Sequence, residues 1–264
     1  MMPNKQDLSM ASPLTCPVPP EISLESPPLK LALARIQFPP ILTINQPSSP
    51  AVAAFQEDMR KDYPDYQMQA NTGLAVVPIS LFRHIFESAS GWNVYLTQEF
   101  VALTATNYRS RAEFVDRIRC VTEATKKHFS PDHATRLGIR FIDRVEGEAV
   151  KEIDQYVNPA FLGPFSNVNS QMAGEALLSP SESEAANMIL RWGYLSPNKP
   201  FHGVEIPPCP DTCWFLDSDI NSKEYDDFDP AKIAADAMVL TGRIYAFFRH
   251  VFNDKFLMSC GGKP

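Results

Sequence analysis

Residues 92–106 decide the fold, and they read WNVYLTQEFVALTAT. Two β-type runs, Trp92–Leu96 and Phe100–Thr106, flank three polar residues, and this spacing predicts an antiparallel hairpin. A helix is expected next, because Ser110 and Glu113 form a capping-box pattern and apolar residues then recur at helical spacing. The order of strand, strand and long amphipathic helix predicts an antiparallel sheet with a helix across it.

The C-terminal third repeats this order. Asn187–Tyr194 and Cys213–Ile220 are strand-like, and Asp229-Pro230 supplies an N-cap followed by proline for a helix to about Asn253. We therefore predict an α+β fold of two tandem units, each an antiparallel sheet covered by a long amphipathic helix.

The predicted domain boundaries follow from composition. Residues 1–27 are rich in Pro and Ser and show no periodicity, which predicts a disordered tail. Residues 28–150 are expected to form the first α+β unit and residues 151–264 the second, packed as one globule.

Composition limits the class of protein. No run approaches the ~18 apolar residues of a membrane span, and the first residues lack a basic segment followed by an apolar one. We therefore expect a cytoplasmic protein without membrane contact. The five cysteines are scattered and odd in number, so we expect free thiols. Cys209 and Cys213 form C-x-x-x-C without a second ligand pair, so neither a metal nor a cofactor is predicted.

The 264-residue chain carries a net charge of −7, which disfavours general nucleic-acid binding. The charge is uneven: residues 205–230 hold eight acids and one lysine, whereas residues 109–144 hold nine bases and five acids. A basic protein partner for the acidic segment is one hypothesis, and a solvated loop is the other. The candidate partner-binding residues are Asp217, Asp219, Asp226 and Asp227.

A row of arginines is the second candidate site. Arg136, Arg140 and Arg144 alternate with Leu137 and its apolar successors, which predicts one arginine-bearing strand face. Guanidinium groups bind phosphate or carboxylate in a bidentate manner, so these residues are candidate anion or ligand contacts. Pairing with nearby acids is the structural alternative. Gly138 within the row would permit close approach of a backbone or a ligand.

The chain carries no familiar catalytic motif. It lacks G-x-S-x-G, a Walker loop and G-x-G-x-x-G, and its five histidines are dispersed. Asp217 and Asp219 begin like a calcium loop, but Ser222 and Phe228 stand where its glycine and glutamate are required. We therefore predict no catalytic residue. The sequence leaves open whether the protein is an enzyme, and it favours a protein without enzymatic activity.

Several segments resemble a sporadically distributed, uncharacterised bacterial family of about 250 residues. They include the opening around Ile36-Gln37-Phe38-Pro39, the run from Phe100 to Tyr108, and the most specific piece, Arg136-Leu137-Gly138-Ile139-Arg140-Phe141-Ile142. The family has no established activity. The resemblance implies an accessory gene of the kind found in defence or toxin-neutralising systems.

The sequence is compatible with three functions. The leading hypothesis is a non-enzymatic protein-interaction module, antitoxin-like or defence-associated, that binds a protein partner. The first alternative is an RNA-binding or RNA-processing protein with tandem ferredoxin-like units. The second is an enzyme that binds a small anion through Arg136 and Arg140.

Overall fold

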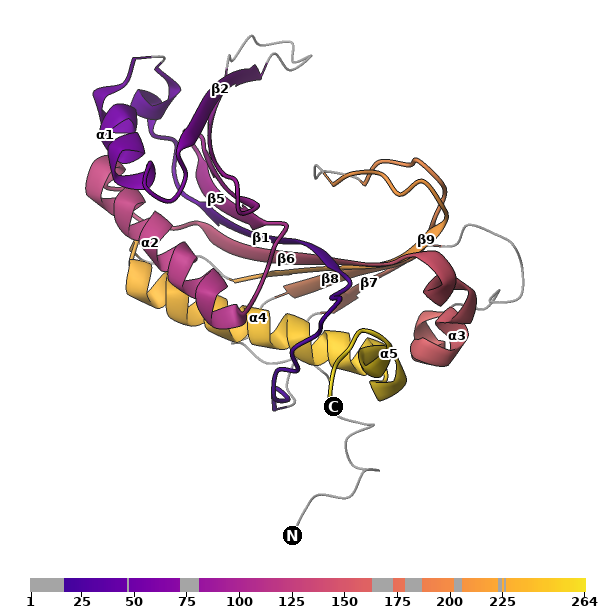
Figure 1. The fold of residues 1–264 in the computed structure, drawn as a ribbon. Coiled ribbons are helices and arrows are strands. Elements are labelled where there is room, and N and C mark those ends of the chain that lie inside the picture. The colour runs from indigo at the N-terminus through magenta and orange to yellow at the C-terminus, as the bar shows by residue number, and fades with distance from the viewer. Residues whose placement is uncertain are drawn as a thin grey trace. The chain divides into compact units, whose positions relative to one another are not determined.

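The structure is a computed structural model that describes residues 17–46, 48–71, 81–162, 173–178, 187–201, 206–222, 225 and 227–264. It confirms the α+β class (Figure 1). The strands are β1 (Leu29–Gln37), β2 (Asp65–Asn71), β3 (Leu81–Ser88), β4 (Trp92–Leu96), β5 (Phe100–Ala105), β6 (Arg136–Val145), β7 (Ala173–Leu178), β8 (Asn187–Leu195) and β9 (Cys213–Asn221). The helices are α1 (Pro50–Met59), α2 (Arg111–Phe129), α3 (Ile153–Tyr156), α4 (Pro230–Val251) and α5 (Asp254–Ser259), with 3-10 turns η2 (Leu42–Asn45), η3 (Gly147–Glu152) and η4 (Pro159–Phe161).

The strands form one antiparallel sheet in the order β2-β3-β4-β5-β1-β6-β9-β8-β7. By compactness the chain divides into two units. Unit 1 draws on Met1–Lys30, Phe141–Ile220 and Leu240–Pro264, and unit 2 on Leu31–Arg140 and Asn221–Val239. Each unit combines segments far apart in sequence, and the boundary expected near residue 150 falls inside unit 1 by this division.

Unit 2 contains the predicted hairpin and helix. β4 and β5 pair antiparallel across the expected turn, with Trp92 opposite Ala105. Ser110 caps α2, because its hydroxyl accepts the amide of Glu113 at 3.2 Å. The second half of the capping box is absent among the described contacts, since the Glu113 carboxylate instead accepts from Arg117 at 3.3 Å. The sequence thus located both ends of this hairpin and the start of its helix.

The helices of unit 2 cover one face of its strands. Figure 1 shows α1 and α2 on the same side, and the described part of unit 2 has no helix on the opposite face. The face of α2 that packs on the strands is the predicted one, and its buried members include Phe114, Ile118, Val121, Thr125 and Phe129. Phe114 contacts Trp92 with a centroid distance of 6.1 Å.

Unit 1 contains a second, smaller helix-covered group of strands. Trp214 of β9 meets Phe252 edge to face, and Trp192 of β8 meets Phe161 in the same way. β7 and β8 pair antiparallel, with Gly174 opposite Trp192. A Cβ at position 174 would stand 2.6 Å from the Trp192 ring, so the close packing of this ring requires glycine there.

The N-terminal segment has partners where the sequence predicted disorder. The amides of Glu25 and Ser26 donate to the Cys260 carbonyl at 2.9 and 3.1 Å. The Tyr245 hydroxyl accepts from the Ile22 amide and donates to the Pro20 carbonyl. Residues 17–27 are therefore held by specific hydrogen bonds, while residues 1–16 lie outside the described part of the chain.

None of the helices in the described ranges is long and apolar enough to cross a membrane.

Candidate functional site

Alternate residues of the unit 2 strands point to opposite faces of the sheet, so each strand contributes to two surfaces. One surface packs against the helices, and we call it the covered face. Its members on three neighbouring strands are at most 1% exposed: Ala32, Ala34, Ile36, Trp92, Val94, Leu96, Val101, Leu103 and Ala105.

The other surface, which we call the open face, carries half-exposed polar and aromatic side chains. The strand register places Tyr95 beside Ala102, Ala102 beside Arg35, and Phe100 beside Gln37. Its principal members are Arg35 and Gln37 of β1, Arg83 of β3, Tyr95 of β4, Phe100 of β5 and Arg136 of β6.

Two of these arginines lie over aromatic rings. The Arg35 guanidinium carbon is 3.9 Å from the centroid of the Phe100 ring, and that of Arg83 is 5.5 Å from the Tyr95 ring. Each contact fixes a flat cation against a flat apolar surface. The open face thus repeats one arrangement, arginine on ring, on two pairs of strands.

Arg35 and Arg136 are like charges placed close together. Burial, followed by the positive charge of Arg136, lowers the pKa of Arg35. Among the described residues, neither arginine forms an ion pair, and the buried Nε of Arg35 has no hydrogen-bond partner. The negative charge of Glu99 partly offsets this effect at Arg35, but no carboxylate in the described part of the chain forms an ion pair with either arginine. An anion held between the two guanidinium groups would therefore be favourable.

Gly138 lies beside both arginines. A Cβ there would stand 3.8 Å from the Arg136 Nε and 3.9 Å from the Arg35 carbonyl oxygen. Both are ordinary van der Waals distances. The close approach that the sequence suggested for this glycine is not observed among the described residues, and the missing side chain simply leaves space.

Amide side chains continue the polar surface toward the edge strand β2. Arg83 donates to the Gln69 side chain at 2.6 Å, and Gln67 donates to Glu87 at 2.9 Å. These residues are neighbours across the β2–β3 register. The edge of the open face is therefore an ordered line of hydrogen-bonding groups.

The structure separates the three arginines of the predicted row. Arg136 belongs to the open face beside Arg35, and Arg140 is half-buried. Arg144 is held in unit 1, where its Nε contacts Glu146 at 2.6 Å and its Nη1 donates to the Pro207 carbonyl at 2.7 Å. The structural alternative therefore describes Arg144, and the anion-binding hypothesis applies to Arg136.

The predicted acidic segment does not form one exposed surface in the described residues. The Asp217 side chain is fully buried on β9, with its Oδ2 3.5 Å from Arg191. Asp219 is half-buried, Asp227 is exposed, and Asp226 lies outside the described residues.

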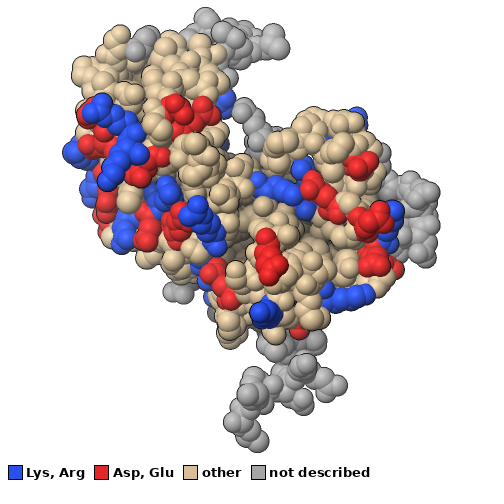
Figure 2. Space-filling model, in the orientation of Figure 1, with Lys and Arg blue, Asp and Glu red and all other residues tan. Residues whose placement is uncertain are grey.

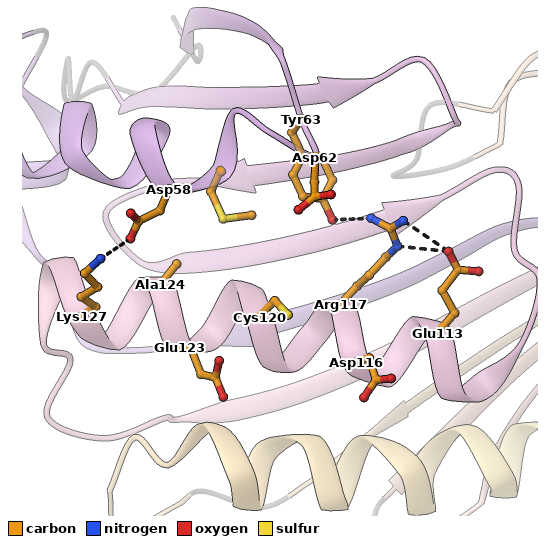
Figure 3. Close-up of a pocket in the computed structure, with 11 residues that line it drawn as sticks. Asp58, Asp62, Tyr63, Glu113, Asp116, Arg117, Cys120, Glu123, Ala124 and Lys127 are labelled. Carbon is orange, nitrogen blue, oxygen red and sulfur yellow. Dashed lines mark hydrogen bonds and ion pairs between the residues drawn. The ribbon is translucent and has the colours of Figure 1, made fainter.

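A groove of about 710 Å³ lies between α1 and α2 and is shown in Figure 3. Its charges are largely paired: Asp58 accepts from Lys127 at 2.6 Å, and Arg117 contacts both Glu113 and the Tyr63 hydroxyl. Figure 2 shows the same mixture of signs over this side of unit 2. Burial raises the pKa of the Cys120 thiol in the groove, so it is not an activated nucleophile. The groove lacks the uncompensated charge of the open face.

The described residues contain no group of three or more His, Cys, Asp or Glu side chains that could hold a metal ion. No sequence motif singled out Arg35, Arg83, Tyr95 or Phe100. The signal for Arg35 was present, because a charged residue interrupts the apolar run of β1 at a position that alternates with buried alanines.

Comparison with known proteins adds little. No protein-family model and no curated protein matches the chain, so the resemblance to a bacterial family stays a prediction. A solved rolling circle replication initiator protein from Geobacillus stearothermophilus matches with 10% identity over 80% of this chain and 79% of that one, at a TM-score of 0.26.

That match runs against the leading expectation from the sequence, and we correct it. A replication initiator is not a toxin-neutralising adaptor, and we withdraw the non-enzymatic protein-interaction module as the function of this chain. At a TM-score of 0.26 the likeness does not show what the chain does instead.

Proposed function

We propose that the open face of unit 2 binds single-stranded nucleic acid. The observation that carries the proposal is the Arg35–Arg136 pair, two adjacent guanidinium groups that form no ion pair among the described residues. A phosphate between them would relieve their mutual repulsion and accept forked hydrogen bonds from both.

The rings beside these arginines favour a nucleic acid over a simple anion. Phe100 and Tyr95 are half-exposed on neighbouring strands, and each already has a guanidinium group near it. Proteins that bind single strands combine a positive track for the backbone with aromatic and arginine surfaces on which bases stack. The amides of Gln37, Gln67 and Gln69 add donors and acceptors for base edges.

The shape of the surface favours a single strand over a duplex. The bases of a duplex are read by an element that enters a groove, such as a helix or a two-stranded ribbon. The open face consists of sheet residues with half-exposed rings, and an unpaired base can lie flat on them. We also propose the cytoplasmic location expected from the sequence, where such ligands occur.

The net charge of −7 limits the expected affinity. Long-range attraction between an acidic protein and a phosphate chain is weak, so binding should depend on local contacts and be sensitive to salt.

The test is fluorescence anisotropy of a labelled single strand of about 12 nucleotides, titrated with protein between about 50 and 200 mM salt. The wild type is compared with the double variant Arg35→Ala and Arg136→Ala. The matched control is Arg60→Ala with Arg119→Ala, which removes the same charge from exposed ion pairs at the end of α1 and on α2.

We expect the open-face variant to lose at least about tenfold in affinity and to lower the salt slope by about 0.7, the value for the one phosphate that the two arginines share. The control should keep both values. Equal losses in the two double variants, or no binding of the wild type at the lowest salt, would refute the proposal. A mononucleotide that competes as well as the oligonucleotide would point to a small-molecule site instead.

A further inference from the structure

A pair of cysteines stands at the start of β9, away from the open face. Cys213 is the first residue of the strand, and Cys209 lies four residues earlier in a segment with prolines at positions 207, 208 and 210. Both are free thiols. Cys209 is 4% exposed and Cys213 is 0% exposed.

The two thiols are in contact. The Cys213 side chain is hydrogen-bonded to that of Cys209, and Cys209 is also hydrogen-bonded to the Glu146 carboxylate. The two sulfur atoms therefore lie within hydrogen-bond reach of one another in the reduced protein.

The segment that carries Cys209 is fixed from both sides within unit 1. The Cys209 carbonyl accepts a hydrogen bond from the Asn198 amide at 2.7 Å, and the Pro207 carbonyl accepts one from Arg144 at 2.7 Å. Glu146, which faces Cys209, is itself bound by Lys30 at 2.8 Å and by Arg144. These contacts hold the thiols together without help from a ligand.

The two cysteines differ in access. Exposed residues adjoin both, Pro208 and Pro210 beside Cys209 and Thr212 before Cys213, but Cys209 itself is 4% exposed and Cys213 0%. A small reagent therefore reaches the Cys209 sulfur before that of Cys213.

We propose that Cys209 and Cys213 form a reversible disulfide by exchange with a low-molecular-weight disulfide. The Cys209 thiolate attacks one sulfur of the small disulfide, and a small thiolate leaves. Cys213 then gives up its proton and attacks the Cys209 sulfur, which releases the second small thiolate. Two protein thiols and one small disulfide thus become one protein disulfide and two small thiols, which take up the two protons.

The expected structural consequence is local. Oxidation removes the hydrogen bond between Cys209 and Glu146 and leaves Glu146 with Lys30 and Arg144. Burial raises the pKa of Cys213 to about 11, which agrees with its second place in the sequence of steps.

The experiment equilibrates the full chain with mixtures of reduced and oxidised glutathione, blocks free thiols with N-ethylmaleimide and maps each cysteine by mass spectrometry. We expect a linked Cys209–Cys213 peptide that appears as the ratio of oxidised glutathione rises and that dithiothreitol reverses. Exposed Cys120 is the internal control, since it should acquire glutathione under the same conditions.

Two single variants test the order of attack. Cys213→Ser should trap a glutathione adduct on Cys209, and Cys209→Ser should leave Cys213 unmodified. Circular dichroism of both variants confirms that each is folded, and Cys209→Ala and Cys213→Ala replace any that is not. The proposal is overturned if Cys209 and Cys213 stay reduced while Cys120 is modified, or if wild-type Cys209 ends as a glutathione adduct without the internal link.

Discussion

The two faces of the unit 2 strands share one backbone and differ in almost everything else. The covered face is apolar and closed to solvent, with Val94, Leu96 and Val101 at 0% exposure. The open face of the same strands carries Arg35, Tyr95 and Phe100, half-exposed and arranged as cations on rings. A solvated sheet face needs only polar side chains, so two like-charged arginines that form no ion pair in the described part of the chain exceed what folding requires. The difference suggests that the covered face stabilises the fold and the open face serves a ligand.

The largest expected effect is the difference in stability between truncating a phenylalanine that packs on the covered face and truncating one on the open face. Phe114 of α2 is 0% exposed and packs on Trp92, so Phe114→Ala should lower the free energy of unfolding by about 3–5 kcal/mol. Phe100 is half-exposed on the open face, so Phe100→Ala should cost less than about 1.5 kcal/mol while weakening binding of a single strand. Urea unfolding of both variants, with anisotropy on the same samples, measures the two effects.

The division between the faces would fail if the two truncations lowered stability equally, or if Phe100→Ala left binding unchanged.

A smaller expected effect is a pH dependence of stability that arises from His84, whose side chain lies on the covered face. His84 is 1% exposed, its Nε2 lies 2.9 Å from the Ile44 carbonyl, and its Nδ1 lies 3.0 Å from the Tyr66 hydroxyl. Burial lowers the pKa of His84, so the unfolded chain takes up this proton more readily than the folded one. The His84 contribution is therefore fully present above the unfolded pKa of about 6.5 and is lost as pH falls through the folded value.

Thermal unfolding measured from pH 8 down to pH 5 should show this loss, and His84→Gln should flatten the curve in that range. Binding on the open face depends on arginines, which stay charged between pH 8 and pH 5. The affinity of the folded protein for a single strand should therefore hardly change over this range. An affinity that fell with pH in step with the stability of the wild-type chain would contradict the separation.

The smallest expected change is at Gly138. Its Cβ would have ordinary contacts, so Gly138→Ala should leave stability unchanged or raise it by about 0.5–1 kcal/mol. The new methyl would stand beside Arg136 and Arg35, in the space that we assign to a phosphate. We expect a few-fold loss of affinity without a loss of stability, and a variant with wild-type affinity would place the ligand elsewhere.

Local signals in the sequence located single elements well. The Ser110 cap, the hairpin after Trp92 and the Asp229-Pro230 helix start are all observed, because each depends on neighbouring residues. The α+β class followed from the order of these elements. β3 (Leu81–Ser88) and β7 (Ala173–Leu178) have no counterpart among the strands that the sequence predicted.

The candidate site depends on information that no local pattern contains. β1 lies between β5 and β6 in the sheet. Arg35 therefore meets Phe100, which is 65 positions away in the sequence, and Arg136, which is 101 positions away, only when the sheet has formed. Alternation did predict that Arg136 points away from buried Leu137. It did not indicate that Arg144, eight residues later on the same strand, would be tied to Glu146 and Pro207.

The central claim is that the open face contacts the ligand. Photocrosslinking of a 5-iodouracil-labelled single strand to the wild-type chain, followed by peptide mapping, tests it most directly. Tyr66 provides an internal control, because it is an aromatic residue of the same unit that is 41% exposed on the other side of the strands. The account predicts adducts on Tyr95 or Phe100 that disappear in the Arg35→Ala, Arg136→Ala variant. Adducts on Tyr66 or on helix α1 or α2, with Tyr95 and Phe100 unmodified, would contradict it.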